Sequence, residues 1–249
     1  MTTTVLVTGA TDGLGRAVAR DLTARGADVL VHGRDERRVA EVAEEIGAER
    51  TFLADFSSLA AVRALADGLP ELDVLVNNAG LISEERVVTG DGLELTFQVN
   101  YLAPFLLTTR YLERHAPRRI VNVASIGQQR PDFDDLMLER GYEPWRAYRQ
   151  SKLAQIMFAF ELAARRPDVE STALHPATFM GTKIVRSRGA PPMNPIQTGA
   201  DATVRLAVDF RIDVGGRFFD VQSEARPDAI AYDREARKRL WDVSERLVV

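Results

Sequence analysis

The chain has 249 residues, a net charge of −4 and no cysteine. The lack of cysteine excludes thiol catalysis, cysteine-bound zinc and disulfide stapling, and the mixed, slightly acidic charge argues against a nucleic-acid partner. Its three histidines, His32, His115 and His175, are too scattered for a metal-ligand spacing, so no metal site is predicted. No apolar run approaches the ~18 residues of a membrane span. We therefore expect a soluble, cytoplasmic protein with no signal peptide and no membrane partner.

Short apolar runs alternate with amphipathic stretches along the chain. The apolar runs are rich in Val, Ile and Leu, as in strands buried on both faces. They cover residues 5–7, 29–31, 51–53, 74–76, 120–123, 172–174 and 218–221. The helical patterns cover residues 13–25, 36–46, 59–69, 92–114, 146–166, 198–209 and 233–246.

This alternation predicts an α/β fold with right-handed crossovers. We expect a single doubly wound Rossmann domain over residues 1–249, with about seven parallel strands and helices on both faces. Ligands of such sheets bind at the carboxyl ends of the strands. Two irregular segments, residues 126–145 and 178–197, follow strands and should emerge at that end.

A glycine-rich loop, TGATDGLG, joins the first strand to the first helix. Glycine permits a tight turn and a close approach to a pyrophosphate, while the helix amino end offers unpaired N–H groups. The flanking strand and helix favour a dinucleotide site over a plain glycine-rich turn. The residues expected at the cofactor are Gly9, Thr11, Asp12, Gly13, Leu14 and Gly15. Among them, Asp12 is expected to cap the helix rather than repel a phosphate.

The end of the second strand indicates which nicotinamide cofactor binds. An acidic residue there would hydrogen bond the adenosine ribose of NAD, whereas an arginine suits the 2′-phosphate of NADP. Arg34, helped by Arg37 and Arg38, favours NADP(H). Asp35 competes, because a misalignment of one residue would favour NAD(H), and a merely solvated Arg34 is a further alternative.

Asp55 and Phe56 follow the third strand and are expected beside the adenine. Asp55 is placed either to accept a hydrogen bond from the adenine amino group or to cap the helix starting near Ser57. The sequence leaves both interpretations open.

Tyr148 and Lys152 are four residues apart on a predicted helix and so share a face. A free tyrosine titrates near ~10, and a nearby ammonium lowers that pKa toward the range useful for proton transfer. A solvated helix face is the default alternative for such a pair. Its context favours a site: Ser125 lies at the end of the fifth strand, and Asn100 is a polar residue in an apolar helix that needs a partner.

Together these motifs resemble the short-chain dehydrogenase/reductase family. The matching points occur in family order over residues 4–185 and comprise TGxxxGxG at Thr8 to Gly15, Asp55, NNAG at Asn77 to Gly80, Asn100, Ser125, and YxxxK at Tyr148 to Lys152. Residues 91–107 and 151–163 are most similar to the retinol-dehydrogenase-like and WW-domain-oxidoreductase-like branch.

The resemblance implies an oxidoreductase that interconverts a carbonyl and an alcohol, with the hydride carried by the cofactor. Ser125 would hydrogen bond the substrate oxygen, and Tyr148 would be the general acid or base. Lys152 would bind the nicotinamide ribose and tune Tyr148, while Asn100 would hold a water in the proton relay.

The resemblance also implies cofactor contacts outside this centre. Asn77 would line the adenosine-side pocket, and Ala79 and Gly80 would let the cofactor approach closely. The family usually has Pro-Gly after the sixth strand, where this chain has Pro176 and Ala177. Pro176 is still expected at the cofactor. A threonine that meets the carboxamide is expected at Thr182 or, alternatively, at Thr178.

Residues 131–145 are an insert, because Ser125 and Tyr148 stand further apart than is usual in the family. The insert mixes aromatic and apolar residues with acids. We interpret it as a substrate-shaping loop or short helix, with a surface elaboration or partner contact as the alternative. With a facing lid at residues 190–197, its apolar content suggests a lipophilic or aromatic carbonyl or alcohol.

Two other functions share parts of this pattern. A nucleotide-sugar epimerase or dehydratase also uses YxxxK, but usually has a different glycine loop and a larger carboxyl-terminal domain. A non-catalytic, dinucleotide-sensing regulator should have lost Ser125, Tyr148 or Lys152. The oligomeric state stays open: helices 92–114 and 146–166 pair subunits in homodimers or homotetramers of the family, but their apolar stripes could instead pack on the sheet.

Overall fold

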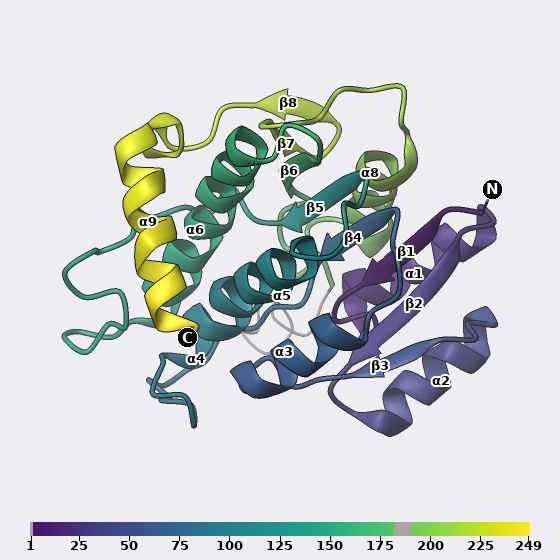
Figure 1. The fold of residues 1–249 in the computed structure, drawn as a ribbon, viewed down its shortest axis with the longest axis horizontal. Helices are drawn as coiled ribbons and strands as arrows, with labels where there is room; N and C mark the ends of the chain where they lie inside the picture. Colours follow the sequence, from purple (N-terminus) through teal and green to yellow (C-terminus); the bar gives the residue numbers. More distant parts are fainter. Residues whose placement is uncertain (1, 182–190) are drawn as a thin grey trace.

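The computed structural model describes residues 2–181 and 191–249. At its centre is one sheet in the strand order β3-β2-β1-β4-β5-β6-β7-β8 (Figure 1). The strands are β1 (Thr4–Val7), β2 (Asp28–Gly33), β3 (Thr51–Leu53), β4 (Val74–Asn77), β5 (Arg119–Val123), β6 (Glu170–His175), β7 (Phe218–Asp220) and β8 (Ser223–Ala225). The first seven are parallel, which confirms the predicted sheet, and β8 adds an antiparallel edge that the sequence pattern did not indicate.

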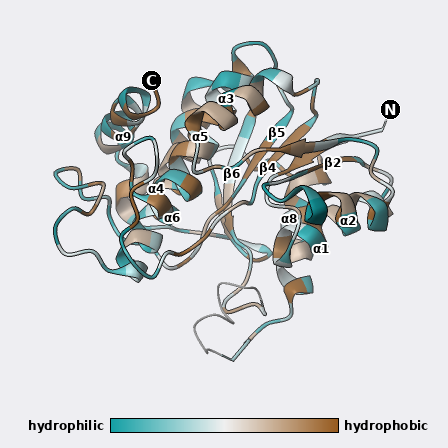
Figure 2. Cartoon of the chain, turned by 90° about the horizontal axis from the view of Figure 1, so that it is seen from below, coloured by the Kyte–Doolittle hydropathy of each residue, from teal (hydrophilic) through white to brown (hydrophobic). Residues whose placement is uncertain are grey.

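Helices cover both faces of the sheet, as the doubly wound fold requires (Figure 2). The described helices of ten or more residues are α1 (Gly13–Ala24), α2 (Glu36–Ile46), α3 (Leu59–Gly68), α5 (Ala103–Leu112), α6 (Pro144–Arg165), α8 (Ile196–Val208) and α9 (Arg234–Leu247). Shorter elements are α4 (Leu95–Phe97), the π-helix η1 (Gln98–Leu102) and the 3-10 helix η2 (Ala229–Tyr232).

Two apolar cores lie on opposite faces of the sheet, and β1 contributes to both. Leu6 packs into the core under α3, α5 and α6, whereas Val5 and Val7 pack into the core under α1, α2 and α8. All three side chains are fully buried. Because successive strand residues point to opposite faces, a strand covered on both sides is apolar throughout.

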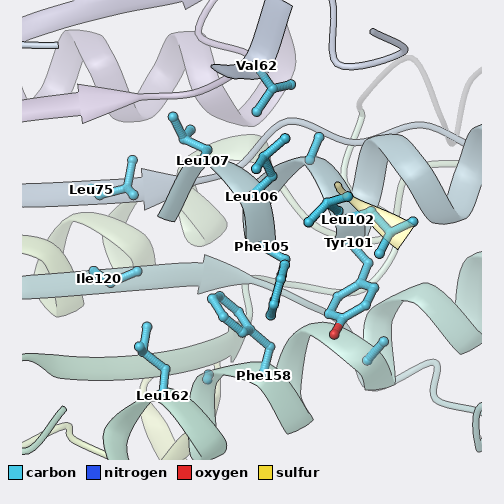
Figure 3. Packing of buried hydrophobic residues seen from close by; sticks show 14 of the residues in the cluster. Val62, Leu75, Tyr101, Leu102, Phe105, Leu106, Leu107, Ile120, Phe158 and Leu162 are labelled. Atoms are coloured by element: carbon cyan, nitrogen blue, oxygen red, sulfur yellow. The ribbon is translucent and has the colours of Figure 1, made fainter. Parts of the chain in front are cut away.

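The carboxyl-terminal helix α9 packs outside this layer, against α6. The Trp241 ring contacts the rings of Phe105 on α5 and Phe158 on α6, with centroids 5.0 Å and 5.8 Å away. The Tyr101 hydroxyl and Ser244 Oγ lie 2.7 Å apart in the same contact. Figure 3 shows Tyr101, Phe105 and Phe158 converging in this core. Part of the apolar surface of α5 and α6 is therefore used within the chain.

The helix predicted over residues 92–114 is interrupted. Gly92 has a φ of 79°, and the buried carboxylate of Glu94 caps the helix that follows by accepting from the N–H groups of Thr96 and Phe97. The π-helix η1 then replaces regular α-helix around Asn100 before α5 begins. Such π-bulges often occur at functional sites.

Candidate active site

Thr8, at the start of the glycine loop, hydrogen bonds the backbone at the end of β4. Thr8 Oγ1 accepts from the backbone N–H groups of Asn78 and Ala79 at 2.9 Å and 3.1 Å. Asn78 Nδ2 donates in return to the carbonyls of Thr8 and Gly9 at 2.8 Å and 3.3 Å. A Cβ on Gly15 would collide with the Gly9 carbonyl and with this Asn78 amide, so the motif needs glycine there.

Asp12 caps α1, as expected from the sequence. Its carboxylate accepts from the Gly13 N–H at 2.7 Å and pairs with Arg38 at 3.0 Å. Arg38 also donates to the Thr11 carbonyl at 3.2 Å. Leu14 follows in the first turn of α1 with its side chain buried. The carboxylate is thus engaged by the helix end and an arginine.

Arg34 and Asp35, the two candidates for contact with the cofactor ribose, have different surroundings after β2. Arg34 is exposed and makes no ion pair within the described part of the chain. Asp35 instead caps α2, with its carboxylate accepting from the Arg38 N–H at 3.1 Å. Gly33 is packed so closely that a Cβ there would lie 2.6 Å from Thr11 Cγ2.

Asp55 forms a turn rather than the cap of α3. Its Oδ1 accepts from both the N–H and the hydroxyl of Ser57, at 2.9 Å and 2.8 Å. The cap of α3 is Ser58, three residues beyond Asp55, and the helix begins at Leu59 rather than near Ser57. Phe56 is buried, and its ring packs on the His32 ring at a centroid distance of 4.8 Å.

Asn77, expected to line the adenosine-side pocket, points into the core. Its side chain is fully buried and donates to Thr108 Oγ1 and Asn122 Oδ1 at 3.1 Å and 3.0 Å. Asn77 is the last residue of β4 and shares a face with Leu75, which packs under α5. The period of two along the strand therefore sends Asn77 into the core and its neighbour Asn78 to the glycine loop.

Lys152 is buried on α6 at the end of β5. Its Nζ donates to the Val123 carbonyl at 2.8 Å and to Gln155 Oε1 at 2.9 Å. The Tyr148 ring centroid lies 5.5 Å from the same nitrogen. Ser125 is two residues beyond Val123; its Oγ accepts from the Gly127 N–H at 3.0 Å, and its hydroxyl is near enough to Tyr148 to lower the pKa of that residue. The structure thus brings Ser125, Tyr148 and Lys152 together, as predicted.

Asn100 links the π-helix to this centre. Its Oδ1 accepts from the Leu81 N–H at 2.8 Å, and its Nδ2 donates to the Leu81 carbonyl and to Ser151 Oγ at 2.9 Å and 3.0 Å. Gly80 lies above: a Cβ there would be 3.2 Å from Asn100 Oδ1 and 3.6 Å from Lys152 Nζ. Glycine at this position keeps the approach to Lys152 open.

Burial sets the proton affinities of the pair. Desolvation raises the pKa of Tyr148 above 10.0, opposed by the Ser125 hydrogen bond. Desolvation also lowers the pKa of Lys152 to about 7. A Lys152 ammonium would lower the pKa of Tyr148, but burial disfavours that charge and so opposes the effect.

The loop after β6 departs from the expected pattern in its backbone. Pro176 and Ala177 are buried, and the left-handed conformation falls on Phe179, with a φ of 44°. The Thr178 hydroxyl lies 3.0 Å from His175 Nε2. Thr182, the other threonine candidate, lies outside the described residues.

The insert at residues 131–145 is a set of turns that lead into α6, with no helix over residues 131–143. The side chains of Leu136 and Leu138 are buried, and Leu136 belongs to the core under α6. Gln150 on α6 anchors the insert through two hydrogen bonds: its side chain accepts from the Asp132 N–H and donates to the Leu136 carbonyl, both at 2.9 Å. Much of the apolar content of the insert is therefore used in packing.

Sequence reasoning missed Asn78 and Gln155. Asn78 was part of a recognised motif, but its partner in the loop was not anticipated. Gln155 follows Lys152 by three residues, a spacing that places both on one helix face and could have suggested their contact. Among the described residues, no cluster of three or more His, Asp or Glu side chains could hold a metal ion.

A family model described as short chain dehydrogenase matches residues 3–191. The chain belongs to this family. It is 38% identical to the provisionally named daunorubicin C-13 ketoreductase DnrU of Streptomyces sp. (strain C5), covering 97% of this chain and 91% of the relative. It is 34% identical to human retinol dehydrogenase 13, covering 98% and 84%. These relatives confirm the resemblance to the retinol-dehydrogenase-like branch.

Solved structures agree with the fold. An uncharacterised protein of Mycobacterium paratuberculosis aligns with a TM-score of 0.83 and 31% identity over 99% of this chain and 93% of that chain. The landomycin C-6 ketoreductase LanV, solved with NADP and rabelomycin, aligns with a TM-score of 0.70 and 28% identity over 88% and 94%. Among the described residues, no helix is both long and apolar enough to cross a membrane.

The buried Lys152 predicts a pH-dependent stability. Its pKa in the folded protein, about 7, lies below the value of 10.5 for a free lysine. Between these values the unfolded chain binds more protons, so the free energy of unfolding should rise with pH, by up to about 1.4 kcal/mol per pH unit. Urea unfolding between pH 7 and 9.5 should show this rise, and Lys152→Met should remove it.

The exposed Lys238, which pairs with Asp242 at 2.6 Å, provides the matched control. Lys238→Met should keep the rise. An unchanged pH dependence in Lys152→Met would show that Lys152 is not the group responsible.

Proposed function

We propose that this chain is an NADP(H)-dependent oxidoreductase that interconverts a carbonyl and an alcohol, with Tyr148 as the general acid or base. The observation that carries the proposal is the meeting of Ser125, Tyr148 and Lys152 at the end of β5, beside an open glycine at Gly80. Membership of the short chain dehydrogenase family supports the same chemistry.

The residues of the glycine loop and of the β4 end fit a dinucleotide. The loop leads into the amino end of α1, where unpaired N–H groups and the helix dipole favour a pyrophosphate. Gly80 leaves room for a ribose above Lys152 Nζ, where a side chain would stand in the way. When bound, the reduced nicotinamide supplies the hydride for carbonyl reduction.

Proton transfer belongs to the side chains of this chain. The Ser125 and Tyr148 hydroxyls would hydrogen bond the carbonyl oxygen, and Tyr148 would give its proton to that oxygen as negative charge develops. The phenolate left behind would be stabilised by the Lys152 ammonium and by the Ser125 hydroxyl. Oxidation of an alcohol runs through the same groups in reverse, with the phenolate as the base.

Three exposed apolar side chains support a lipophilic substrate. Ile126 follows Ser125 and is 50% exposed, while Phe179 and Met193 are 40% and 67% exposed. The Met193 N–H donates to the Phe179 carbonyl at 2.8 Å, so these two residues are neighbours beyond β6. An apolar substrate would cover such side chains on binding. Relatives named for daunorubicin and retinol are consistent with this class.

Removal of the Tyr148 hydroxyl should separate chemistry from cofactor binding. Tyr148→Phe should lower kcat for carbonyl reduction by a factor of about 100 or more, because the proton donor is lost. The NADPH dissociation constant should stay within a factor of about three. A panel of carbonyls and alcohols, followed by nicotinamide absorbance, provides the assay. Equal turnover in Tyr148→Phe would refute the assignment, and NADPH binding without turnover on the whole panel would favour a dinucleotide sensor.

Arg34 should decide the preference for NADPH over NADH. A guanidinium on a 2′-phosphate makes charge-assisted hydrogen bonds, so Arg34→Ala should weaken NADPH binding by about 10-fold or more. NADH binding should change little. The exposed Arg25 lies at the end of α1 away from the glycine loop. The control variant Arg25→Ala should therefore bind both cofactors normally. Tighter binding of NADH than NADPH by the natural chain would contradict the proposal.

The substrate panel should favour bulky apolar or aromatic carbonyls over small polar ones. Ile126→Ser should lower kcat/KM for the apolar substrates by about 5- to 30-fold, because roughly 1–2 kcal/mol of apolar burial is lost. The effect on small polar substrates should be slight. Tyr232→Ser, at a residue 50% exposed in η2, should leave the ranking unchanged. Faster reduction of small polar carbonyls would argue against a lipophilic substrate.

A further inference from the structure

His32, at the end of β2, is buried among the loops that would hold the dinucleotide, yet none of the proposed functional roles uses it. Its side chain is 2% exposed. Its Nδ1 lies 3.2 Å from the Gly9 nitrogen, and its Nε2 lies 3.2 Å from the Ala54 carbonyl oxygen. One imidazole therefore spans from the glycine loop after β1 to the end of β3.

These two contacts fix the tautomer. The Gly9 N–H can only donate, so Nδ1 must be unprotonated and act as the acceptor. The Ala54 carbonyl can only accept, so Nε2 must carry the hydrogen. Burial lowers the pKa of His32 to about 4, which keeps this neutral form at physiological pH. A protonated ring would turn a second N–H toward the Gly9 N–H and lose that bond.

The backbone of His32 adds a further contact to the same loop. Its carbonyl accepts from the Ala10 N–H at 2.9 Å, next to the side-chain bond to Gly9. Gly9 itself has a φ of 65°, a conformation that other residues seldom adopt. The turn at Gly9 is thus held from one side by His32 and from the other by Asn78, whose amide donates to the Gly9 carbonyl.

We propose that His32 is a positioning residue for the dinucleotide, whose neutral imidazole fixes the Gly9 turn so that the loop is already shaped for a pyrophosphate. The inference rests on the proposed cofactor site. A binding loop fixed before the ligand arrives loses less conformational freedom on binding. An apolar ring of similar size would fill the space beside Phe56, but it would leave the Gly9 N–H and the Ala54 carbonyl without their partner.

Two amide substitutions can separate the two bonds. In His32→Asn, the side-chain oxygen can occupy the position of Nδ1 and accept from Gly9, while the bond to Ala54 is lost. In His32→Gln, the longer side chain can place its NH₂ near the position of Nε2 and donate to Ala54, while the acceptor for Gly9 is lost. Both variants remove the ring and differ in which bond they keep.

The experiment measures NADPH dissociation constants by fluorescence titration, together with thermal unfolding and with kcat at saturating NADPH. We expect His32→Asn to bind NADPH within about threefold of the natural chain, and His32→Gln to bind at least about 10-fold more weakly. Once NADPH is saturating, kcat should agree within about twofold in both. A loss of Gly9 positioning thus shows in cofactor affinity, whereas general unfolding would lower Tm and kcat together.

Equal NADPH affinity in the Asn and Gln variants, whether retained or weakened, would overturn the inference and leave His32 with a packing role. If one amide variant fails to fold, the comparison passes to His32→Ser and His32→Phe. Neither of these keeps a group positioned for Gly9, so a Tm within a few degrees of the natural chain with undiminished NADPH affinity would equally overturn it. Failure of the natural chain to bind NADPH or NADH would instead refute the proposed function.

Discussion

The hydrogen bond from Lys152 Nζ to the Val123 carbonyl joins α6 to the carboxyl end of β5, and the proposed chemistry depends on it. Ser125 lies two residues beyond Val123 along the chain, and Tyr148 lies one helical turn before Lys152. One bond between a helix and a strand end therefore sets the distance between the hydroxyl groups that must meet a substrate. Gly80, beyond the end of β4, lies beside the same nitrogen, and Asn100 on the π-helix lies beside Gly80.

The sequence predicted the strands well and indicated that Ser125, Tyr148 and Lys152 would lie together, because both depend on local patterns. Apolar runs mark buried strands, and a spacing of four marks a helix face. What it could not predict depends on how elements meet. Asn77 and Asn78 look alike in the sequence, and the face of β4 alone separates them. The π-helix at Asn100 arises where Leu81 and Ser151 take up the amide, and neither contact is visible from periodicity.

The apolar side chains of the insert and of α5 and α6 show a similar limit. From composition alone, those of the insert looked available for a substrate and those of the two helices for another subunit. Leu136 instead packs into the core, and Trp241 lies against Phe105 and Phe158. Hydrophobicity predicts that a side chain will be covered, but the partner that covers it depends on tertiary packing. Ile126, which is 50% exposed next to Ser125, therefore carries more weight for substrate class than the apolar content of the whole insert.

The two buried bases of the site, His32 and Lys152, are held by hydrogen bonds to uncharged groups. The ion pair of Asp12 with Arg38 lies instead at the rim of the site. A buried ion pair would carry a large desolvation cost, and a neutral partner avoids part of it. For Lys152 the consequence is chemical. A neutral amine still has two N–H groups, enough to satisfy both Val123 and Gln155, so these bonds survive either protonation state. With a pKa of about 7, the proton that Lys152 gains or loses need not come from either bond, so its charge can change without dismantling the site.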